Sequence, residues 1–167
     1  MLSGRCLRHF LKDREAKVLL SEVSSGLGVD LASVLHGKIG LEEVKLDFGE
    51  VFLVGGRPLL FKVAGGRVFP TLLFSEFFGL APRVVVDMGA VPYVCKGADV
   101  MRPGVVRFEG DFKVGSCVFV VDVKFGKALA VGEAVLDKNA AETAKQGIVV
   151  RNVHYVGDKV WSFLKQV

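Results

Sequence analysis

The sequence predicts an α+β protein, in which a small N-terminal domain of helices and an antiparallel meander packs on a C-terminal β-barrel. Three observations predict this class. Apolar residues recur at helical spacing from Lys12 to Leu27, but from Glu43 the period changes to two. Glycine pairs then separate short strands. The chain has 167 residues, 51% of them hydrophobic, which suffices for one domain of common size or two small ones with packed cores.

The first half is expected to hold two helices, a meander and a further helix. The helix at 12–27 ends around Gly26 and Gly28, and a short second helix runs from Asp30, a good N-cap, to Gly37. Strands are expected at 44–48, 51–54, 58–63 and 68–69. A strongly apolar helix begins at Pro70 and ends after Phe78. Its crowded apolar face predicts burial between two rigidly packed domains, residues 1–82 and 83–167.

The second half is expected to form mainly strands. A buried strand covers 83–87, and a short helix follows at 89–94 with Pro92 in its first turn, where a missing N–H costs little. Strands at 118–123 and 127–134 form a hairpin about Phe125-Gly126. With further strands at 105–108 and 148–155, these segments suffice for a small closed β-barrel.

Charge, hydropathy and cysteine usage argue against several classes of protein. The net charge of +4 does not by itself indicate nucleic acid, and no uncharged run approaches the roughly 18 residues of a membrane span. The three cysteines are widely spaced, which indicates neither a zinc ribbon nor a disulfide framework and favours a reducing cytoplasm. The basic opening, residues 1–14, is typical of an organelle presequence or of a basic first strand or arm, and Asp13 and Glu15 count against the presequence.

The stretch Lys96-Gly97-Ala98-Asp99-Val100-Met101-Arg102-Pro103-Gly104 is the most particular in the chain. Two glycines leave main chain uncovered beside three cations, Lys96, Arg102 and Arg107, all expected at the surface. Such a surface suits a sugar-phosphate backbone, because exposed N–H groups donate to phosphate and cations neutralise it. The alternative is that both glycines only form turns and that Asp99 makes a turn hydrogen bond. Lys138, Lys145 and Arg151 either flank the same face or belong to a solvated surface.

This stretch resembles the signature of the PUA domain, the RNA-binding module named after pseudouridine synthases and archaeosine transglycosylase. Two later blocks, Val131-Gly132-Glu133-Ala134 and the segment from Gly147 to Asp158, are similar to the late strands of that domain. Where the family often has a basic residue, this chain has Pro92, so we expect Lys96 to supply the charge. The candidate RNA-binding residues are Lys96, Gly97, Ala98, Arg102, Pro103, Gly104, Arg107, Lys138 and Arg151.

The first half resembles the pre-PUA segment of the malignant T-cell-amplified sequence family of translation proteins, which is related to ligatin. Phe69-Pro70-Thr71-Leu72 matches the motif that precedes the PUA domain there. A scarcity of side-chain amides, with abundant Val and a high apolar share, favours a heat-adapted source. The resemblance is to an archaeal-type member of the family. The resemblance implies a non-enzymatic RNA-binding protein on the small ribosomal subunit or its tRNA, in initiation, reinitiation or recycling. The partner it implies is a start-codon-sensing-domain protein like density-regulated protein.

No catalytic, metal-ligand or cofactor motif is found, so we expect neither an enzyme nor a metal or cofactor. A second hypothesis makes the chain an RNA-targeting subunit that works in trans with a tRNA- or rRNA-modifying enzyme. A third is a protein-interaction domain without affinity for RNA, whose binding would hardly change with salt.

Overall fold

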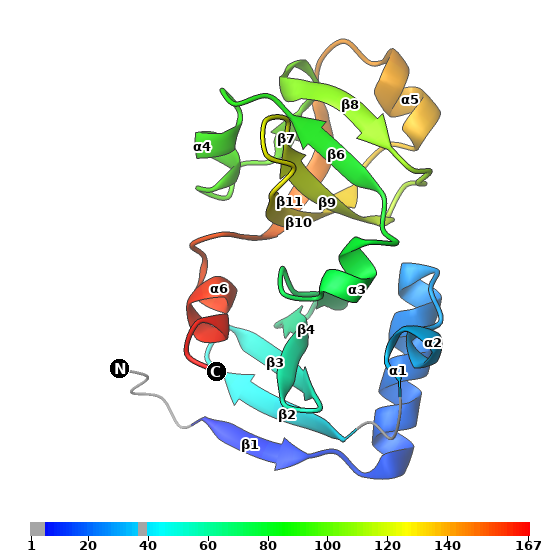
Figure 1. Cartoon of the computed structure of the whole chain (residues 1–167), viewed down its shortest axis with the longest axis vertical. Coiled ribbons are helices and arrows are strands. Elements are labelled where there is room, and N and C mark those ends of the chain that lie inside the picture. The colour runs from blue at the N-terminus through cyan, green and yellow to red at the C-terminus, as the bar shows by residue number, and fades with distance from the viewer. Residues whose placement is uncertain (1–5, 37–39) are drawn as a thin grey trace.

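Two β-sheets, one from each half of the chain, are stacked along the long axis of the molecule (Figure 1). The computed structural model describes residues 6–36 and 40–167. Met1–Arg5 and Gly37, which belong to the predicted basic opening and to the end of the second helix, lie outside the described residues. The α+β class, with an N-terminal meander and a C-terminal barrel-like sheet, is confirmed, but that sheet is an open half-barrel where a closed barrel was expected. Within the described ranges, no helix has the length and apolarity needed to span a membrane.

The first sheet is antiparallel throughout. Its strands lie in chain order: β1 (Leu7–Phe10), β2 (Leu41–Leu46), β3 (Gly49–Val54), β4 (Arg57–Val63) and β5 (Val68–Pro70). Between β1 and β2 the chain forms α1 (Asp13–Leu27) and α2 (Leu31–Val34), both drawn in blue beside the sheet (Figure 1). Gly28 ends α1 with a left-handed φ of 67°, and the Asp30 carboxylate caps α2 by accepting from the amide of Ala32 at 3.0 Å. The first two predicted helices are therefore confirmed.

The predicted helix start at Pro70 is wrong. Pro70 is the last residue of β5 and pairs with Leu60 of β4, and the helix α3 covers only Ser75–Phe78. Thr71 explains the difference, because its amide donates to the Leu59 carbonyl at 2.8 Å and its hydroxyl donates to the Pro58 carbonyl at 2.8 Å. These two bonds extend the pairing with β4, so the chain stays extended before it turns into α3.

The second sheet has six strands in the order β7-β11-β10-β9-β6-β8 and curls into a half-barrel. The strands, their connecting turn and their helices are β6 (Arg83–Val86), α4 (Val91–Val94), β7 (Val100–Met101), the single 3-10 turn η1 (Arg102–Gly104), β8 (Val105–Glu109), β9 (Cys117–Asp122), β10 (Ala128–Ala134), α5 (Lys138–Thr143), β11 (Ile148–Tyr155) and α6 (Lys159–Leu164). The two edge strands, β7 and β8, are not hydrogen-bonded to each other as a pair. The 3-10 turn η1 connects them along the chain. The sequence did not predict β7, α5 or α6.

The two halves share one hydrophobic core. Phe119 of β9 is fully buried against α3, with its ring centroid 5.9 Å from that of Phe77 and 5.0 Å from that of Phe78. The C-terminal helix α6 returns to the first half and buries Val160 and Phe163 in the same core. The halves therefore pack closely, and a boundary near residue 82 stays a prediction.

Asp158 fastens α6 to this shared core and gives a pH-dependent prediction. Burial raises the pKa of its carboxyl, but a 2.8 Å hydrogen bond with His154 and amide donors from Trp161 and Tyr155 outweigh burial, so the pKa is lowered. A lowered folded-state pKa adds stability above the unfolded pKa of about 3.9, and this stability disappears as pH falls further. Asp158→Asn should cost about 2 kcal/mol at neutral pH and flatten the acid limb of melting temperature against pH. An unchanged acid limb in Asp158→Asn would contradict this account.

Candidate nucleic-acid interface

The short helix α4 lies between the two glycines singled out in the sequence. Gly97 closes its C-terminus with a φ of 94°, and a Cβ there would stand 2.9 Å from the Tyr155 ring. Gly104 lies against its N-terminus, where a Cβ would stand 3.2 Å from the Cβ of Ala90. Gly97 therefore needs glycine both for close packing and for its backbone conformation, whereas a larger residue at Gly104 would press on Ala90. We call residues 96–104 the glycine loop.

The first three amides of the loop are occupied, which corrects the expectation of exposed N–H groups at Gly97. Lys96 and Ala98 each donate to the Tyr93 carbonyl at 3.1 Å, and Gly97 donates to the Val94 carbonyl at 3.0 Å. These bonds end α4, so the three N–H groups are not free to donate to phosphate. A ligand would therefore contact the closely packed surface around the two glycines and the exposed side chains at its edge.

The glycine loop is fastened to β11 by Asn152. The backbone N–H of Asn152 donates to the Asp99 carboxylate at 2.9 Å. The Asn152 side-chain amide donates to the backbone carbonyls of Val94 and Ala98 at 3.1 and 3.0 Å. Asp99 thus makes a structural hydrogen bond, as the turn interpretation held, but its partner is 53 residues away. Three bonds to one residue hold the loop in a single shape, which favours recognition without an ordering cost.

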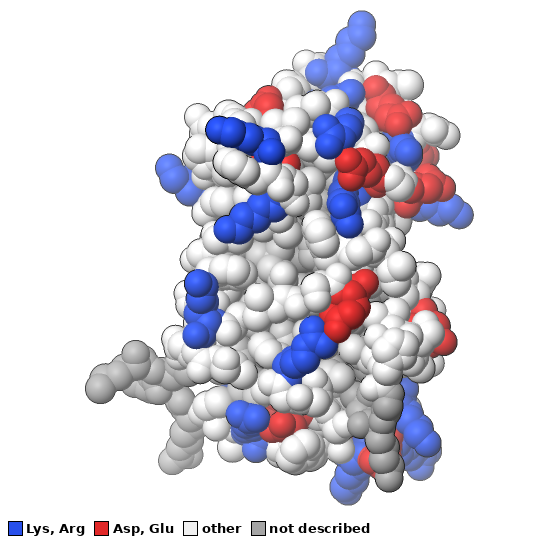
Figure 2. Space-filling model, viewed as in Figure 1, with Lys and Arg blue, Asp and Glu red and all other residues white. Residues whose placement is uncertain are grey.

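Lys96, Ala98 and Pro103 are exposed around this fixed loop. Lys96 has no carboxylate partner within the part of the chain that the structure describes. Arg107 is exposed on β8 but pairs with Glu109, with 3.0 Å between its Nε and the carboxylate. In the upper half of Figure 2, most acidic side chains lie over β8 and α5, whereas basic side chains lie on both sides, the α4 side included. The α4 side therefore carries positive charge with few acidic side chains beside it.

Arg102 is half-buried, so the expectation of three surface cations is wrong for this residue. Its guanidinium donates to the Val105 carbonyl at 3.2 Å and to the Glu142 carbonyl at 3.4 Å, and lies 5.3 Å from the centroid of the Phe108 ring. Arg102 therefore ties η1 to α5. Its replacement would disturb the fold as well as any contact with a ligand.

Lys138 and Arg151, which were expected to flank the glycine loop, form ion pairs with carboxylates outside the loop. Lys138, on α5, is 4.0 Å from the Glu142 carboxylate. Arg151 lies 3.0 Å from the Glu133 carboxylate, which is also 3.9 Å from the Nε of Arg67 in the first half. This cluster stands at the boundary between the halves. The structure thus brings Lys96, Gly97, Ala98, Pro103 and Gly104 together, whereas no hydrogen bond or ion pair among the described residues joins Arg151 to the glycine loop.

The turn between β9 and β10 adjoins the glycine loop, and the sequence did not indicate it as part of the site. The Asp87 amide donates to the Gly104 carbonyl and the Val123 amide donates to the Val86 carbonyl, each at 2.9 Å. The end of β6 therefore has η1 on one side and the turn on the other. This turn, residues 123–127, exposes Lys124, Phe125 and Lys127. The sequence signal that could have indicated this turn is an aromatic residue between two lysines, Lys124-Phe125-Gly126-Lys127.

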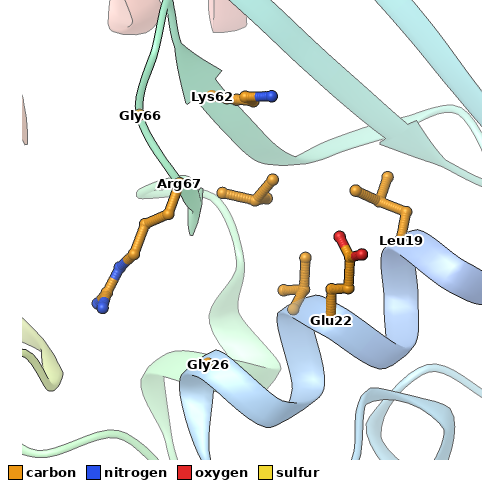
Figure 3. Close-up of a pocket in the computed structure, with 8 residues that line it drawn as sticks. Leu19, Glu22, Gly26, Lys62, Gly66 and Arg67 are labelled. Atoms are coloured by element: carbon orange, nitrogen blue, oxygen red, sulfur yellow. The ribbon is translucent and has the colours of Figure 1, made fainter.

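A pocket in the first half is a weaker candidate. It has a volume of about 210 Å³ and lies between α1 and β4, lined by residues that include Glu22, Lys62 and Arg67. Figure 3 shows that Lys62 and Arg67 point in different directions and that neither meets Glu22. Among the described residues, no three His, Cys, Asp or Glu side chains gather as a metal site would require. The glycine loop is therefore the better-formed site.

Comparison with known proteins identifies both halves. Residues 82–156 match the PUA domain family, and residues 7–75 match a family described as a domain of unknown function, DUF1947. An uncharacterized protein of Methanocaldococcus jannaschii is 34% identical over 93% of this chain and 96% of its own length. A crystal structure of a PUA domain protein from Aeropyrum pernix K1, a tartrate complex, superposes with a TM-score of 0.84 at 31% identity over 96% of this chain and 92% of that one.

Relatives from eukaryotes match two thirds or more of this chain. The malignant T-cell-amplified sequence 1 homolog of Dictyostelium discoideum is 31% identical over 77% of this chain and 74% of its own length. Translation machinery-associated protein 20 of Saccharomyces cerevisiae is 27% identical over 68% of this chain and 66% of its own length. The chain therefore belongs to the malignant T-cell-amplified sequence family, in which a pre-PUA domain precedes a PUA domain.

Proposed function

We propose that this chain is a non-enzymatic RNA-binding protein of the cytoplasm that acts in translation, on the small ribosomal subunit or on tRNA bound there. The observation that carries the proposal is the rigid glycine loop with the exposed Lys96 at its rim. A low contour allows a sugar-phosphate chain to approach closely, and an unpaired lysine gains more from a phosphate than a lysine already held by a carboxylate.

The structure of the loop suggests which kind of RNA it binds. The amides of Lys96, Gly97 and Ala98 are used internally, so we expect binding to rely on shape and on side-chain cations, with few hydrogen bonds to base edges. Double-stranded RNA is recognised mainly in this way, because its deep major groove hides the bases. We therefore propose a structured RNA, and a helix end in particular, as the ligand of the glycine loop.

The role in translation is supported by the relative named translation machinery-associated protein 20. Initiation, reinitiation and recycling all fit a protein that binds the small subunit with tRNA. A start-codon-sensing-domain protein like density-regulated protein is the partner we propose for these steps.

Co-sedimentation tests this function directly. The chain should migrate with purified small ribosomal subunits of Methanocaldococcus jannaschii in a density gradient at low salt and be released as salt rises, because phosphate contacts weaken with counterion concentration. A chain that stays at the top of the low-salt gradient, or that sediments equally at all salt concentrations, would overturn the proposal. Capture of an RNA-modifying enzyme in place of the subunits would favour the targeting role in trans.

A further inference from the structure

Strand β1 forms a bare edge of the first sheet. It is the first strand in the order β1-β2-β3-β4-β5, so it pairs with β2 alone, and all four of its residues are exposed. Leu7 and Phe10 are 62% and 67% exposed. In Figure 1, β1 lies at the end of the molecule away from the second sheet. An uncovered edge with apolar side chains is ready to pair with another strand.

The opposite edge of the same sheet, β5, is blocked by a proline. The Thr71 amide donates to the Leu59 carbonyl at 2.8 Å, and Pro70 lies opposite Leu60. Because inward and outward residues alternate along an antiparallel strand, Thr71 faces β4 and Pro70 faces outward. Pro70 has no N–H to offer an added strand. Strand β1 contains no proline, and its pairing with β2 has no bulge, so the two edges are not equally protected.

The backbone groups that β1 leaves free belong to Arg8 and Phe10. The Leu11 amide donates to the Leu41 carbonyl at 2.9 Å, and Phe10 lies opposite Glu42. Every second residue counted back from Leu11 therefore turns its N–H and C=O toward β2, and the residues between them turn theirs away from the sheet. An added strand would form its hydrogen bonds with Arg8 and Phe10.

We propose that two copies of this chain associate by antiparallel pairing of β1 with the partner's β1, about a two-fold axis at His9. In this register Arg8 lies opposite the partner's Phe10, and Phe10 lies opposite the partner's Arg8. These are the residues with free backbone groups, so each pair exchanges two hydrogen bonds. The two five-stranded sheets then form one continuous sheet.

The side chains on one face of the paired strands suit each other. Arg8 and Phe10 lie on the same face, because side chains alternate along a strand. The Arg8 guanidinium donates to the Glu42 carboxylate at 2.5 and 3.3 Å, so its charge is already compensated within its own sheet. In the pair it lies beside the partner's Phe10 ring, where a cation over an aromatic face stabilises the contact and the ring is withdrawn from water.

The other face selects the register. With the axis at His9, Leu7 meets the partner's Leu11, and the two His9 side chains meet at the axis, each with its Nε2 3.3 Å from its own Glu43 carboxylate. A register centred on Arg8 would place the two Arg8 side chains opposite each other and would set Leu7 against His9. Like charges directly opposite destabilise a strand pair, so the axis at His9 is favoured.

A second copy suits this edge because the two free residues complement each other under two-fold symmetry. One pair of short strands buries less than the roughly 1,200 Å² of a standard interface, so the dimer should be weak, with a Kd on the order of 100 µM. The glycine loops would lie at the two far ends of the dimer, since β1 and the second sheet are at opposite ends of the chain (Figure 1). The inference therefore does not depend on the proposed RNA binding.

Analytical ultracentrifugation of the full chain from about 10 µM to about 1 mM tests the association. The weight-average mass should rise from 18.0 kDa toward twice that value. Phe10→Lys places a lysine opposite the partner's Arg8 at both pairs, and Phe10→Pro removes the outward N–H, so both variants should stay monomeric. Because Phe10 is exposed, Phe10→Lys should melt at the wild-type temperature when dilute.

The matched control is Phe125→Lys, the same substitution at a phenylalanine that is 72% exposed in the other half. This variant should dimerise like the wild-type chain. A mass of 18.0 kDa at every concentration overturns the proposal, as does dimerisation that Phe10→Lys leaves unchanged or that Phe125→Lys weakens equally. A wild-type chain that stays monomeric while its β1 pairs with a strand of another protein also overturns it.

Disulfide trapping tests the register. In a Cys6→Ser background, His9→Cys brings two thiols to a pair without hydrogen bonds, where the Cα atoms are about 4.5 Å apart and within reach of a disulfide. Oxidised glutathione should therefore cross-link His9→Cys into a covalent dimer and should cross-link Arg8→Cys much less. Stronger cross-linking of Arg8→Cys than of His9→Cys would overturn the axis at His9.

Discussion

Replacing Phe119 by alanine is expected to lower the free energy of unfolding by about 4 kcal/mol, the largest stability effect of a single substitution that we predict. Phe119 is fully buried, and its ring contacts Phe77 and Phe78 at the junction of the two halves. Its removal leaves a cavity that neither sheet can close, because each is fixed by its own strand pairing. The loss should appear in chemical denaturation and should include a second transition as the halves begin to unfold separately.

Phe125→Ala provides the comparison for this measurement. The two phenylalanines lie six residues apart on the same hairpin, but Phe125 is exposed, so its loss should change the free energy of unfolding by less than about 0.5 kcal/mol. A cost below about 1 kcal/mol for Phe119→Ala would show that the halves do not depend on a shared core.

The largest effect on binding is expected from the double variant Lys96→Ala, Lys127→Ala. Both side chains are exposed on the α4 side of the half-barrel, and both lack carboxylate partners among the residues that the structure describes. Each phosphate contact contributes about 0.7 to 0.9 to the slope of log affinity against log salt, so the slope should fall by about 1.5. At about 0.1 M salt, this corresponds to a loss of roughly 30-fold in affinity for an RNA hairpin.

The double variant Arg14→Ala, Lys17→Ala is the control, because it removes the same charge from exposed positions on α1. Its affinity should fall only through the change in net charge, and its salt slope should match that of the wild-type chain. Equal losses in the two double variants would mean that overall charge, and not the glycine-loop face, determines binding.

Local signals in the sequence predicted much of the fold. The change to a period of two at Glu43, with glycines between the strands, predicted the meander, and Asp30 and Gly28 predicted helix ends that the structure contains. A proline before apolar residues is typical of a helix start, but Pro70 pairs with Leu60 and the long-range bonds of Thr71 keep the chain extended. Helix α6 has six residues, too few to show a helical period.

For the site, the sequence indicated the loop but not how its atoms are used. The residue order of the stretch from Lys96 to Gly104 is enough to indicate the loop. The burial of Arg102 depends on Phe108 and on the Glu142 carbonyl, and the latter lies 40 residues away. The pattern at Phe125-Gly126 predicts only the centre of a hairpin and does not indicate that the Phe125 ring is exposed. Its exposure and its closeness to α4 follow from strand pairing, which no local pattern contains.

The central claim is that one end of the half-barrel binds RNA, and amide chemical shifts during a titration with a blunt RNA hairpin test it most directly. We predict that the largest shift changes fall within residues 88–104 and 123–127, while the amides of α1 and β1 hardly move. Largest changes on the first sheet instead, under conditions where binding weakens with salt, would contradict the account.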